Sequence, residues 1–230
     1  EAKVEIMDAD TMKGKSKLLS LYKRLENKEV DILIGTQMIA KGHDLPGVTL
    51  VGIISADQSL GLPDFRSGER TFQLVTQVAG RAGRGDVPGK VVVQTYNPEH
   101  PSIKFALNHD SEGFLKQEME IRRPLFYPPF SKLVNIKIKS SKEDEGKVFI
   151  KNLKTISRQL CSKLPENVSI ELAGPSEAPI YRMQNKYRWQ MLVKAENHNL
   201  LNIYCSKLYE LLKNKKGSIK LSMDIDPYNF

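Results

Sequence analysis

The order in which apolar segments follow one another constrains the fold of this chain more than any other feature. Up to about residue 100, short apolar runs typical of strands alternate with segments of helical periodicity. Strands are expected over residues 3–7, 30–34, 48–54 and 90–96, and helices over residues 15–26 and 67–82. This alternation predicts an α/β domain with a doubly wound parallel sheet, in which the strands over residues 30–34 and 48–54 are expected to be buried.

A different order begins beyond residue 130. A stretch of helical pattern over residues 97–120 leads to Arg122-Arg-Pro-Leu-Phe-Tyr-Pro-Pro129, whose prolines indicate a linker or domain boundary. Strands are then expected over residues 132–139, 168–172, 187–194 and 218–225, and helices over residues 142–164 and 199–213. This is the β-α-β-β-α-β order of a smaller, ferredoxin-like α+β domain. We expect domains over residues 1–97 and 131–230, joined by a helical linker over residues 98–130.

The strongest chemical signal is Gln77-Val-Ala-Gly-Arg81-Ala-Gly-Arg84. On a continuous helix, Gln77, Arg81 and Arg84 lie opposite an apolar stripe, which is formed by Phe72, Val75, Ala79 and Ala82. Two adjacent guanidinium groups repel unless an anion lies between them, and a triphosphate suits such a pair. The alternative is a solvated basic helix end, where arginine is favourable for the helix dipole. The spacing favours the functional interpretation.

A second segment, Gly35-Thr-Gln-Met-Ile-Ala-Lys-Gly-His-Asp44, begins where a predicted strand ends. Open α/β sheets bind their ligands at that edge. Thr36 and Gln37 are expected at the N-terminus of a short helix, whose free N–H groups favour a phosphate. Gly42 and Asp44 are expected in a turn close to the same edge. Alternatively, the start of the segment only caps a helix.

Near the C-terminus, Tyr181-Arg-Met-Gln-Asn-Lys-Tyr-Arg-Trp189 interleaves basic and aromatic residues around a turn. Aromatic rings can stack on unpaired bases while cations meet phosphates, so Arg182, Lys186 and Arg188 are candidate DNA contacts. A basic face could be extended by Lys137, Lys139, Lys142 and Lys147. The alternative is a hairpin with Trp189 in the core and a solvated, charged tip.

The composition of the chain limits the classes of partner that it is expected to bind. The formal net charge is +8, which suggests a polyanion, nucleic acid first, or simply a lysine-rich surface that favours solubility. Cys161 and Cys205 show no disulfide or zinc spacing and fit a reducing cytoplasm. The sequence contains neither a secretory signal nor an apolar run of the roughly 20 residues needed to span a bilayer, so we expect no membrane partner. The chain lacks an initiator methionine, which suggests a fragment.

The two motif segments together resemble motifs V and VI of superfamily 2 helicases. Further segments occur in the order typical of one family: Met7-Asp-Ala-Asp-Thr11, Asp64-Phe-Arg-Ser-Gly-Glu-Arg70, Pro98-Glu-His-Pro101, Tyr127-Pro-Pro-Phe130, Ala173-Gly-Pro175 and Tyr187-Arg-Trp-Gln190. Over almost its whole length, the chain is similar to the C-terminal part of the primosomal protein N′ family of bacterial replication-restart DNA helicases.

The resemblance implies a RecA-like second motor lobe followed by the C-terminal domain of an ATP-dependent 3′-to-5′ helicase. Such enzymes act in the bacterial cytoplasm at stalled forks, with ATP and Mg²⁺ as cofactors. Their partners are forked and single-stranded DNA, primosome proteins and single-strand-binding proteins. The resemblance further implies a role for each motif residue. Arg81 and Arg84 contact the ATP phosphates, with Arg84 as arginine finger, and Gln77 couples the two. Gly42 and Asp44 lie by the nucleotide, and Thr36 and Gln37 touch the DNA backbone.

Several parts of the family pattern are not recognisable in this chain: the Walker A loop, the Walker B motif, the N-terminal DNA-binding domain and the cysteine-rich zinc insertion. The segment 9–16 fits a relaxed P-loop pattern, but bulky side chains and the Asp10 carboxylate stand where phosphate would lie. The chain alone is therefore expected neither to bind ATP tightly nor to hydrolyse it. Two pairs of aspartates are each separated by a single residue: Asp8 with Asp10, and Asp224 with Asp226. We interpret both pairs as turn formers rather than as metal ligands.

Two other functions remain open. One is a non-catalytic nucleic-acid-binding module with a motor-like fold, and the other is an RNA helicase lobe, although segments 127–130 and 187–190 have no place there. The sequence upstream of Glu1 would separate the first from a helicase: a Walker A loop, a Walker B motif and paired cysteines favour the enzyme, and an initiator methionine favours the binding module.

Overall fold

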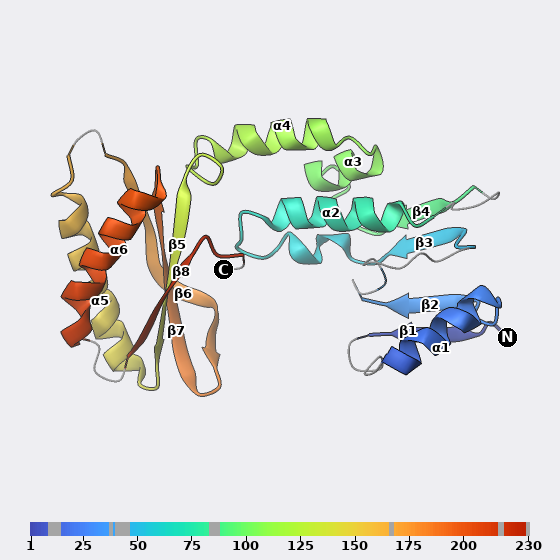
Figure 1. The fold of residues 1–230 in the computed structure, drawn as a ribbon, viewed down its shortest axis with the longest axis horizontal. Coiled ribbons are helices and arrows are strands. Elements are labelled where there is room, and N and C mark those ends of the chain that lie inside the picture. Colours follow the sequence, from blue (N-terminus) through green and yellow to red (C-terminus); the bar gives the residue numbers. More distant parts are fainter. Residues whose placement is uncertain are drawn as a thin grey trace. The chain divides into compact units, whose positions relative to one another are not determined.

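The structure is a computed structural model that describes residues 1–8, 15–36, 39, 47–82, 88–165, 168–215 and 219–228. The chain divides into two compact units: unit 1 comprises Glu1–Gln117 and unit 2 comprises Glu118–Phe230. Figure 1 labels the helices and strands of both. Within the described ranges, no helix combines the length and the apolar character needed to cross a membrane.

Unit 1 contains two parallel strand pairs. β1 (Val4–Met7) pairs with β2 (Ile32–Gly35), and β3 (Leu50–Ile53) pairs with β4 (Lys90–Val93). The parallel pairing was predicted, but the described residues form two separate two-stranded sheets rather than one continuous sheet. The predicted burial of residues 30–34 and 48–54 is wrong for Ile32, Ile34, Leu50 and Ile54, which are about half exposed or more. Val4 and Ile6 of β1 are also about half exposed and form one apolar face of the first pair with Ile32 and Ile34.

The helix α1 (Lys15–Glu26) connects the strands of the first pair and has the predicted bounds. Helical periodicity places Leu18, Leu21, Tyr22 and Leu25 on one apolar face. Leu21 is buried, and the other three are half-buried. The opposite side of the helix is charged, and Arg24 forms an ion pair with Glu5 of β1 at 2.5 Å. Periodicity alone therefore identified both the extent of α1 and the face that it buries.

The core of unit 1 lies around α2 (Ser67–Ala79). α2 packs against α3 (Pro101–Leu107), and the next helix, α4 (Ser111–Arg122), contributes Phe114. The rings of Phe72 and Phe114 stack with their centroids 4.2 Å apart. The turn η1 (Ala56–Ser59) adds Ala56 to the same cluster. The first part of the segment expected as a linker, residues 98–117, thus belongs to unit 1.

Unit 2 is built on a four-stranded antiparallel sheet with the order β6-β7-β5-β8. Its elements follow the predicted β-α-β-β-α-β order: β5 (Lys132–Ser140), α5 (Glu143–Cys161), β6 (Ile170–Met183), β7 (Lys186–Ala195), α6 (His198–Leu212), a short η2 (Lys213–Lys215) and β8 (Lys220–Ile225). β6 is much longer than the expected strand over residues 168–172, because it continues into a hairpin with β7.

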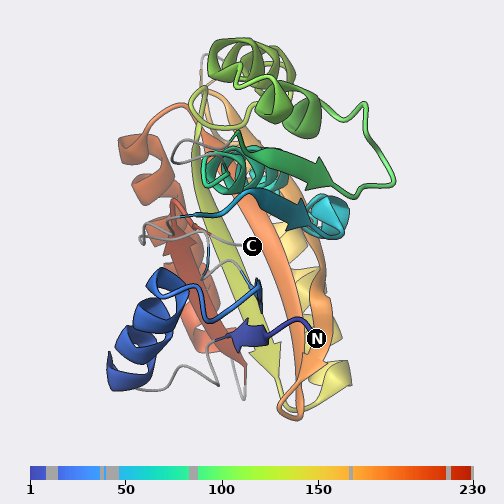
Figure 2. The ribbon, with the colours of Figure 1, turned by 90° about the vertical axis from the view of Figure 1, so that its right-hand side faces the viewer.

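The two faces of this sheet differ. In Figure 1, α5 and α6 lie on one side of it, and Figure 2 looks toward its other side. The helix-covered face carries the core of unit 2, in which Val134, Ile136 and Ile138 alternate along β5 and are fully buried. Since successive residues of a strand project to opposite faces, the residues between these three belong to the face without helices.

The proline-rich segment before β5 is held against unit 2. The Nζ of Lys194 on β7 donates a hydrogen bond to the Leu125 carbonyl at 2.6 Å and lies 3.9 Å from the centre of the Tyr127 ring. The Ser131 hydroxyl donates to the Phe126 carbonyl at 2.8 Å. The segment therefore packs as a part of unit 2.

Candidate functional site

The segment Gln77–Arg84, called here the glutamine–arginine motif, begins on a helix that ends earlier than predicted. α2 stops at Ala79, with Gly80 as its C-cap, whereas the sequence predicted a helix to Ala82. The Arg81 N–H then donates to the Val78 carbonyl at 3.0 Å, as in a tighter turn. Glycine has a low helix propensity, so the helix ends at Gly80. The predicted helix end at Ala82 is therefore three residues too late, and the alignment of Gln77 and Arg81 on one face stays a prediction.

Gln77 lies just before this helix end, and Arg81 lies just after it. Gln77 is exposed near the C-terminus of α2, and the half-buried Arg81 follows in the turn. Burial raises the pKa of Tyr22 on α1, and the positive charge of Arg81 opposes that rise. The Arg81 charge therefore acts close to α1. Arg84 lies outside the described residues.

Thr36 directly follows β2 and is exposed at the carboxyl end of the β1–β2 pair, as predicted. Its carbonyl accepts a hydrogen bond from the Ile39 N–H at 3.1 Å. Only glycine fits at position 35, because a Cβ there would overlap the Met7 carbonyl and the Ile39 side chain. The other residues predicted at this edge lie outside the described residues: Gln37, Gly42 and Asp44.

Sequence reasoning assigned no role to Asp64, although it stands in one of the motif segments. Its nearly buried carboxylate forms an ion pair with Arg70 at 2.9 Å and accepts the Arg66 N–H at 3.0 Å. The Asp64 carbonyl accepts the Ser67 N–H at 3.0 Å. These contacts fix the start of α2, and hence the position of the motif at its other end. A separation of six residues matches no helix side-chain pairing, so the spacing of Asp64 and Arg70 gave no signal for this ion pair.

A second unassigned carboxylate, Asp57, joins η1 to the end of β4. It accepts hydrogen bonds from the Thr95 hydroxyl and from the Tyr96 N–H, the latter at 2.7 Å. These two bonds hold the pKa of Asp57 below its ordinary value. Since the partners are 38 and 39 residues away, no local sequence pattern could have identified them.

The aromatic residues near the predicted DNA-contacting hairpin form a cluster in the core. Trp189 is buried, and its ring centroid lies 5.5 Å from that of Tyr181 and 6.4 Å from that of Tyr187. All three pack on the helix-covered face of the sheet. The alternative stated from the sequence, a hairpin with Trp189 in the core and a charged tip, is therefore confirmed for Trp189.

The three cations predicted at this hairpin do not share one face. Arg182 is opposite Tyr187 in the β6–β7 ladder, on the helix-covered side, and its guanidinium lies 5.1 Å from the centre of that ring. Lys186 and Arg188 project from the other face, because they alternate with Tyr187 and Trp189. Only two of the three predicted DNA contacts are therefore brought together.

Three of the four lysines proposed to extend the basic face are paired with carboxylates. Lys137 lies 2.8 Å from Asp224, Lys142 lies 2.7 Å from Glu145, and Lys147 lies 2.5 Å from Glu143. Lys139 differs from them, since no ion pair joins it to a carboxylate in the part of the chain that the structure describes.

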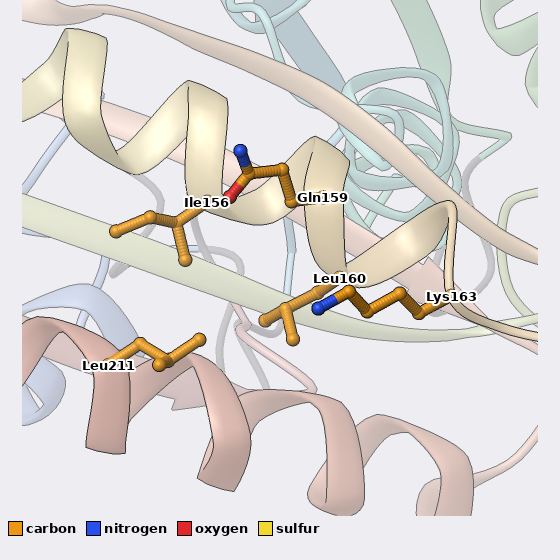
Figure 3. A pocket seen from close by; sticks show the side chains of 5 residues that line it. All are labelled: Ile156, Gln159, Leu160, Lys163 and Leu211. Atoms are coloured by element: carbon orange, nitrogen blue, oxygen red, sulfur yellow. The ribbon is translucent and has the colours of Figure 1, made fainter.

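A groove of about 290 Å³ lies between α5 and α6 (Figure 3). It is lined by Ile156, Gln159, Leu160, Lys163 and Leu211. Its lining offers one amine and one amide but no hydroxyl, thiol, imidazole or carboxylate, so no second catalytic group accompanies Lys163 in this lining. Across the described ranges, no group of three or more potential metal-ligating residues comes together.

The two cysteines are free thiols with little reactivity. Burial raises the pKa of Cys205 to about 11, and burial also raises the pKa of Cys161. Both thiols are therefore protonated near neutral pH, and neither is suited to act as a nucleophile. Of the carboxylates considered as metal ligands, Asp224 pairs with Lys137 and Asp226 pairs with His198 at 2.6 Å.

Comparisons with known proteins match both units. Residues 1–86 match the helicase conserved C-terminal domain, and residues 123–228 match the primosomal protein N C-terminal domain. A replication restart protein PriA from Synechocystis is 39% identical over 220 residues, which cover 96% of this chain and 26% of that protein. The one from Bacillus subtilis is 39% identical over 229 residues, covering 99% of this chain and 28% of that protein. The chain thus spans about a quarter of the length of these two relatives.

Proposed function

The chain belongs to the primosomal protein N family of replication restart proteins, and we propose that it supplies part of an ATP-dependent 3′-to-5′ DNA helicase. The observation that carries this proposal is the match of residues 1–86 to a helicase C-terminal domain, since these residues contain the glutamine–arginine motif. In this proposal, residues 1–97 contribute a RecA-like second motor lobe, and residues 131–230 form a ferredoxin-like domain behind the helical linker of residues 98–130.

ATP with Mg²⁺ supplies the phosphoryl-transfer chemistry of such a motor, and another lobe of the enzyme holds most of the nucleotide. In the proposal, Arg81 and Arg84 contact the phosphates, with Arg84 as the arginine finger and Gln77 coupling the two. Gly42 and Asp44 lie by the nucleotide.

The DNA contacts in this proposal come from both units. Thr36 is exposed at the carboxyl end of β2, where a backbone phosphate can approach, and Gln37 follows it. In unit 2, the contacts are Arg182, Lys186 and Arg188. The whole protein would act in the cytoplasm at stalled forks, together with primosome and single-strand-binding proteins.

The arginine finger is tested by Arg84→Ala in the full-length protein. DNA-stimulated ATP hydrolysis should fall by about 10³-fold or more, because an arginine finger stabilises transition-state charge. DNA binding should be retained. The matched control is Arg158→Ala, which removes an exposed arginine on α5. Near-normal ATP turnover in the Arg84 variant would refute the assignment and would favour a non-catalytic binding module.

The chain of 230 residues should not hydrolyse ATP by itself. This follows from the proposal that its arginines complete a nucleotide site that another lobe provides. Release of phosphate from ATP, measured with the purified chain and single-stranded DNA, should stay at background. Turnover above that background, and absent from an Arg81→Ala preparation made in parallel, would contradict the proposal.

A further inference from the structure

The sheet face of unit 2 that lacks helices carries a different set of side chains from the core face. It is formed by residues that alternate with the buried ones along β5, β7 and β8. We call this the open face, and its residues at the end of the sheet near the hairpin are Lys137, Lys139, Arg188, Gln190, Lys220 and Ser222.

Three of these residues form one row of positive charge. Lys139 stands directly opposite Arg188 on β7 and directly opposite Lys220 on β8. Directly opposite residues of an antiparallel ladder project from the same face, and neighbouring strands lie about 4.8 Å apart. The three cations therefore cross the sheet in a row about 10 Å long, and we call it the cationic row.

Protein carboxylates do not neutralise the cationic row in the described part of the chain. No ion pair there involves any of its three members. The Arg188 guanidinium instead donates toward the Met183 sulfur at 3.8 Å. Like charges directly opposite each other destabilise a sheet. The row therefore costs stability in the free protein, and a bound anion would relieve that cost.

The neighbouring positions indicate what kind of anion fits. The next row on the open face consists of Gln190, Lys137 and Ser222, which offer hydrogen-bond donors. Lys186 is exposed and alternates with Tyr187 onto the same face as Arg188. The aromatic cluster of the hairpin lies on the opposite face. A ligand here meets cations and donors rather than rings on which bases could stack.

We propose that the cationic row binds the phosphodiester backbone of DNA, independently of base sequence. The proposal rests on the proposed function, because it assigns the DNA contact of unit 2 to named residues. It moves that contact from the hairpin tip to the open face: Arg188 is kept, Lys139 and Lys220 are added, and Arg182 falls on the other side.

The test uses the 230-residue chain and a triple variant, Lys139→Gln with Arg188→Gln and Lys220→Gln. The matched control is Lys142→Gln with Lys147→Gln and Lys213→Gln, which removes the same charge from three lysines that are paired with glutamates. Binding is measured by fluorescence anisotropy with labelled 30-nucleotide probes: oligo-dT, a mixed sequence, and a duplex of that mixed sequence, at several KCl concentrations.

The row variant should lose roughly tenfold or more in affinity at low salt, and the slope of log K against log[KCl] should fall by about two to three. The control should keep its slope and lose less than about threefold. The loss should be equal on oligo-dT and on the mixed sequence. A loss on the single strand or on the duplex alone supports the proposal and identifies which backbone is bound.

Stability separates binding from a merely structural role. Because Lys139 faces like charges on both sides, Lys139→Gln should leave the thermal midpoint of the free chain unchanged or raise it. Equal affinity losses in the row variant and the control would overturn the proposal, as would unequal losses on the two single strands or a lower midpoint for Lys139→Gln. If the unaltered chain binds none of the probes, the DNA-contacting part of the proposed function itself fails. If the unaltered chain binds DNA and the row variant binds it equally well, only the assignment of the contact to the cationic row is refuted.

Discussion

Gly146 shows how closely one residue can determine the packing of a helix. It lies in the second turn of α5, where the six-membered ring of Trp189 occupies the space that a Cβ would need. A glycine inside a helix costs about 1 kcal/mol relative to alanine. That cost is offset here because the helix approaches the sheet closely over the largest side chain of the core.

We predict that Gly146→Ala destabilises unit 2 by about 1–3 kcal/mol, because the added methyl group overlaps the Trp189 ring. Urea unfolding followed by circular dichroism measures the change. The control is Gly80→Ala, whose Cβ would meet its nearest neighbour at an ordinary 3.5 Å and should be neutral or stabilising. Trp189→Phe, combined with Gly146→Ala, should cost less than the sum of the two changes. A Gly146→Ala protein as stable as the unaltered chain would contradict this account.

At the scale of single elements, periodicity predicted what a helix buries better than where it ends. Phe72, Val75 and Ala79 are all buried as the pattern required. The end of α2 depended instead on Gly80, whose effect on the following residues cannot be seen in an apolar stripe. Likewise, alternation placed Trp189 and Arg188 on opposite faces, but the partners of Lys137 and Asp57 lie far away in the sequence and had no local signal.

Lys194 is one of the side chains that hold the segment before β5. Lys194 is nearly buried and holds this segment through the Leu125 carbonyl, the Tyr127 ring and, more loosely, Glu171 at 3.5 Å. A hydrogen bond to a charged group contributes about 1.5–3 kcal/mol. We infer that this lysine keeps the segment packed on unit 2.

We predict that Lys194→Met loosens the segment of residues 123–131 while the sheet stays folded. The methionine fills the same space but cannot donate to the Leu125 carbonyl. Amide hydrogen exchange, read by mass spectrometry on peptides from this segment, should become faster by about tenfold or more. Lys154→Met, at an exposed position of α5, is the control and should leave the exchange unchanged. Equal exchange in the two variants would count against the inference.

At the scale of the whole molecule, the two units differ in how much core they have. In the described residues, the buried cluster of unit 2 is roughly twice as large as that of unit 1. The β1–β2 pair also leaves one apolar face about half exposed. Composition and strand order predicted two domains, but they could not reveal this inequality. It depends on how many neighbours each strand finds, and apolar runs look alike whether a strand has one neighbour or two.

We therefore predict that unit 1 opens more readily than unit 2. Hydrogen exchange of the intact chain should show amides of β1 and β2 exchanging at least about tenfold faster than amides of β5 and β7, because few buried contacts must break to expose them. Rates are compared after correction for the intrinsic exchange of each sequence. Protection of β1 and β2 equal to that of β5 and β7 would show that the exposed apolar face does not weaken this unit.

The turn between β6 and β7 carries a consequence for protein engineering. Gln184 and Asn185 both have positive φ, 52° and 57°, in a two-residue loop whose geometry favours asparagine followed by glycine. Replacing them by that pair would make the hairpin stiffer without changing its charge. A designer could thus tune the rigidity of this arm independently of its electrostatics.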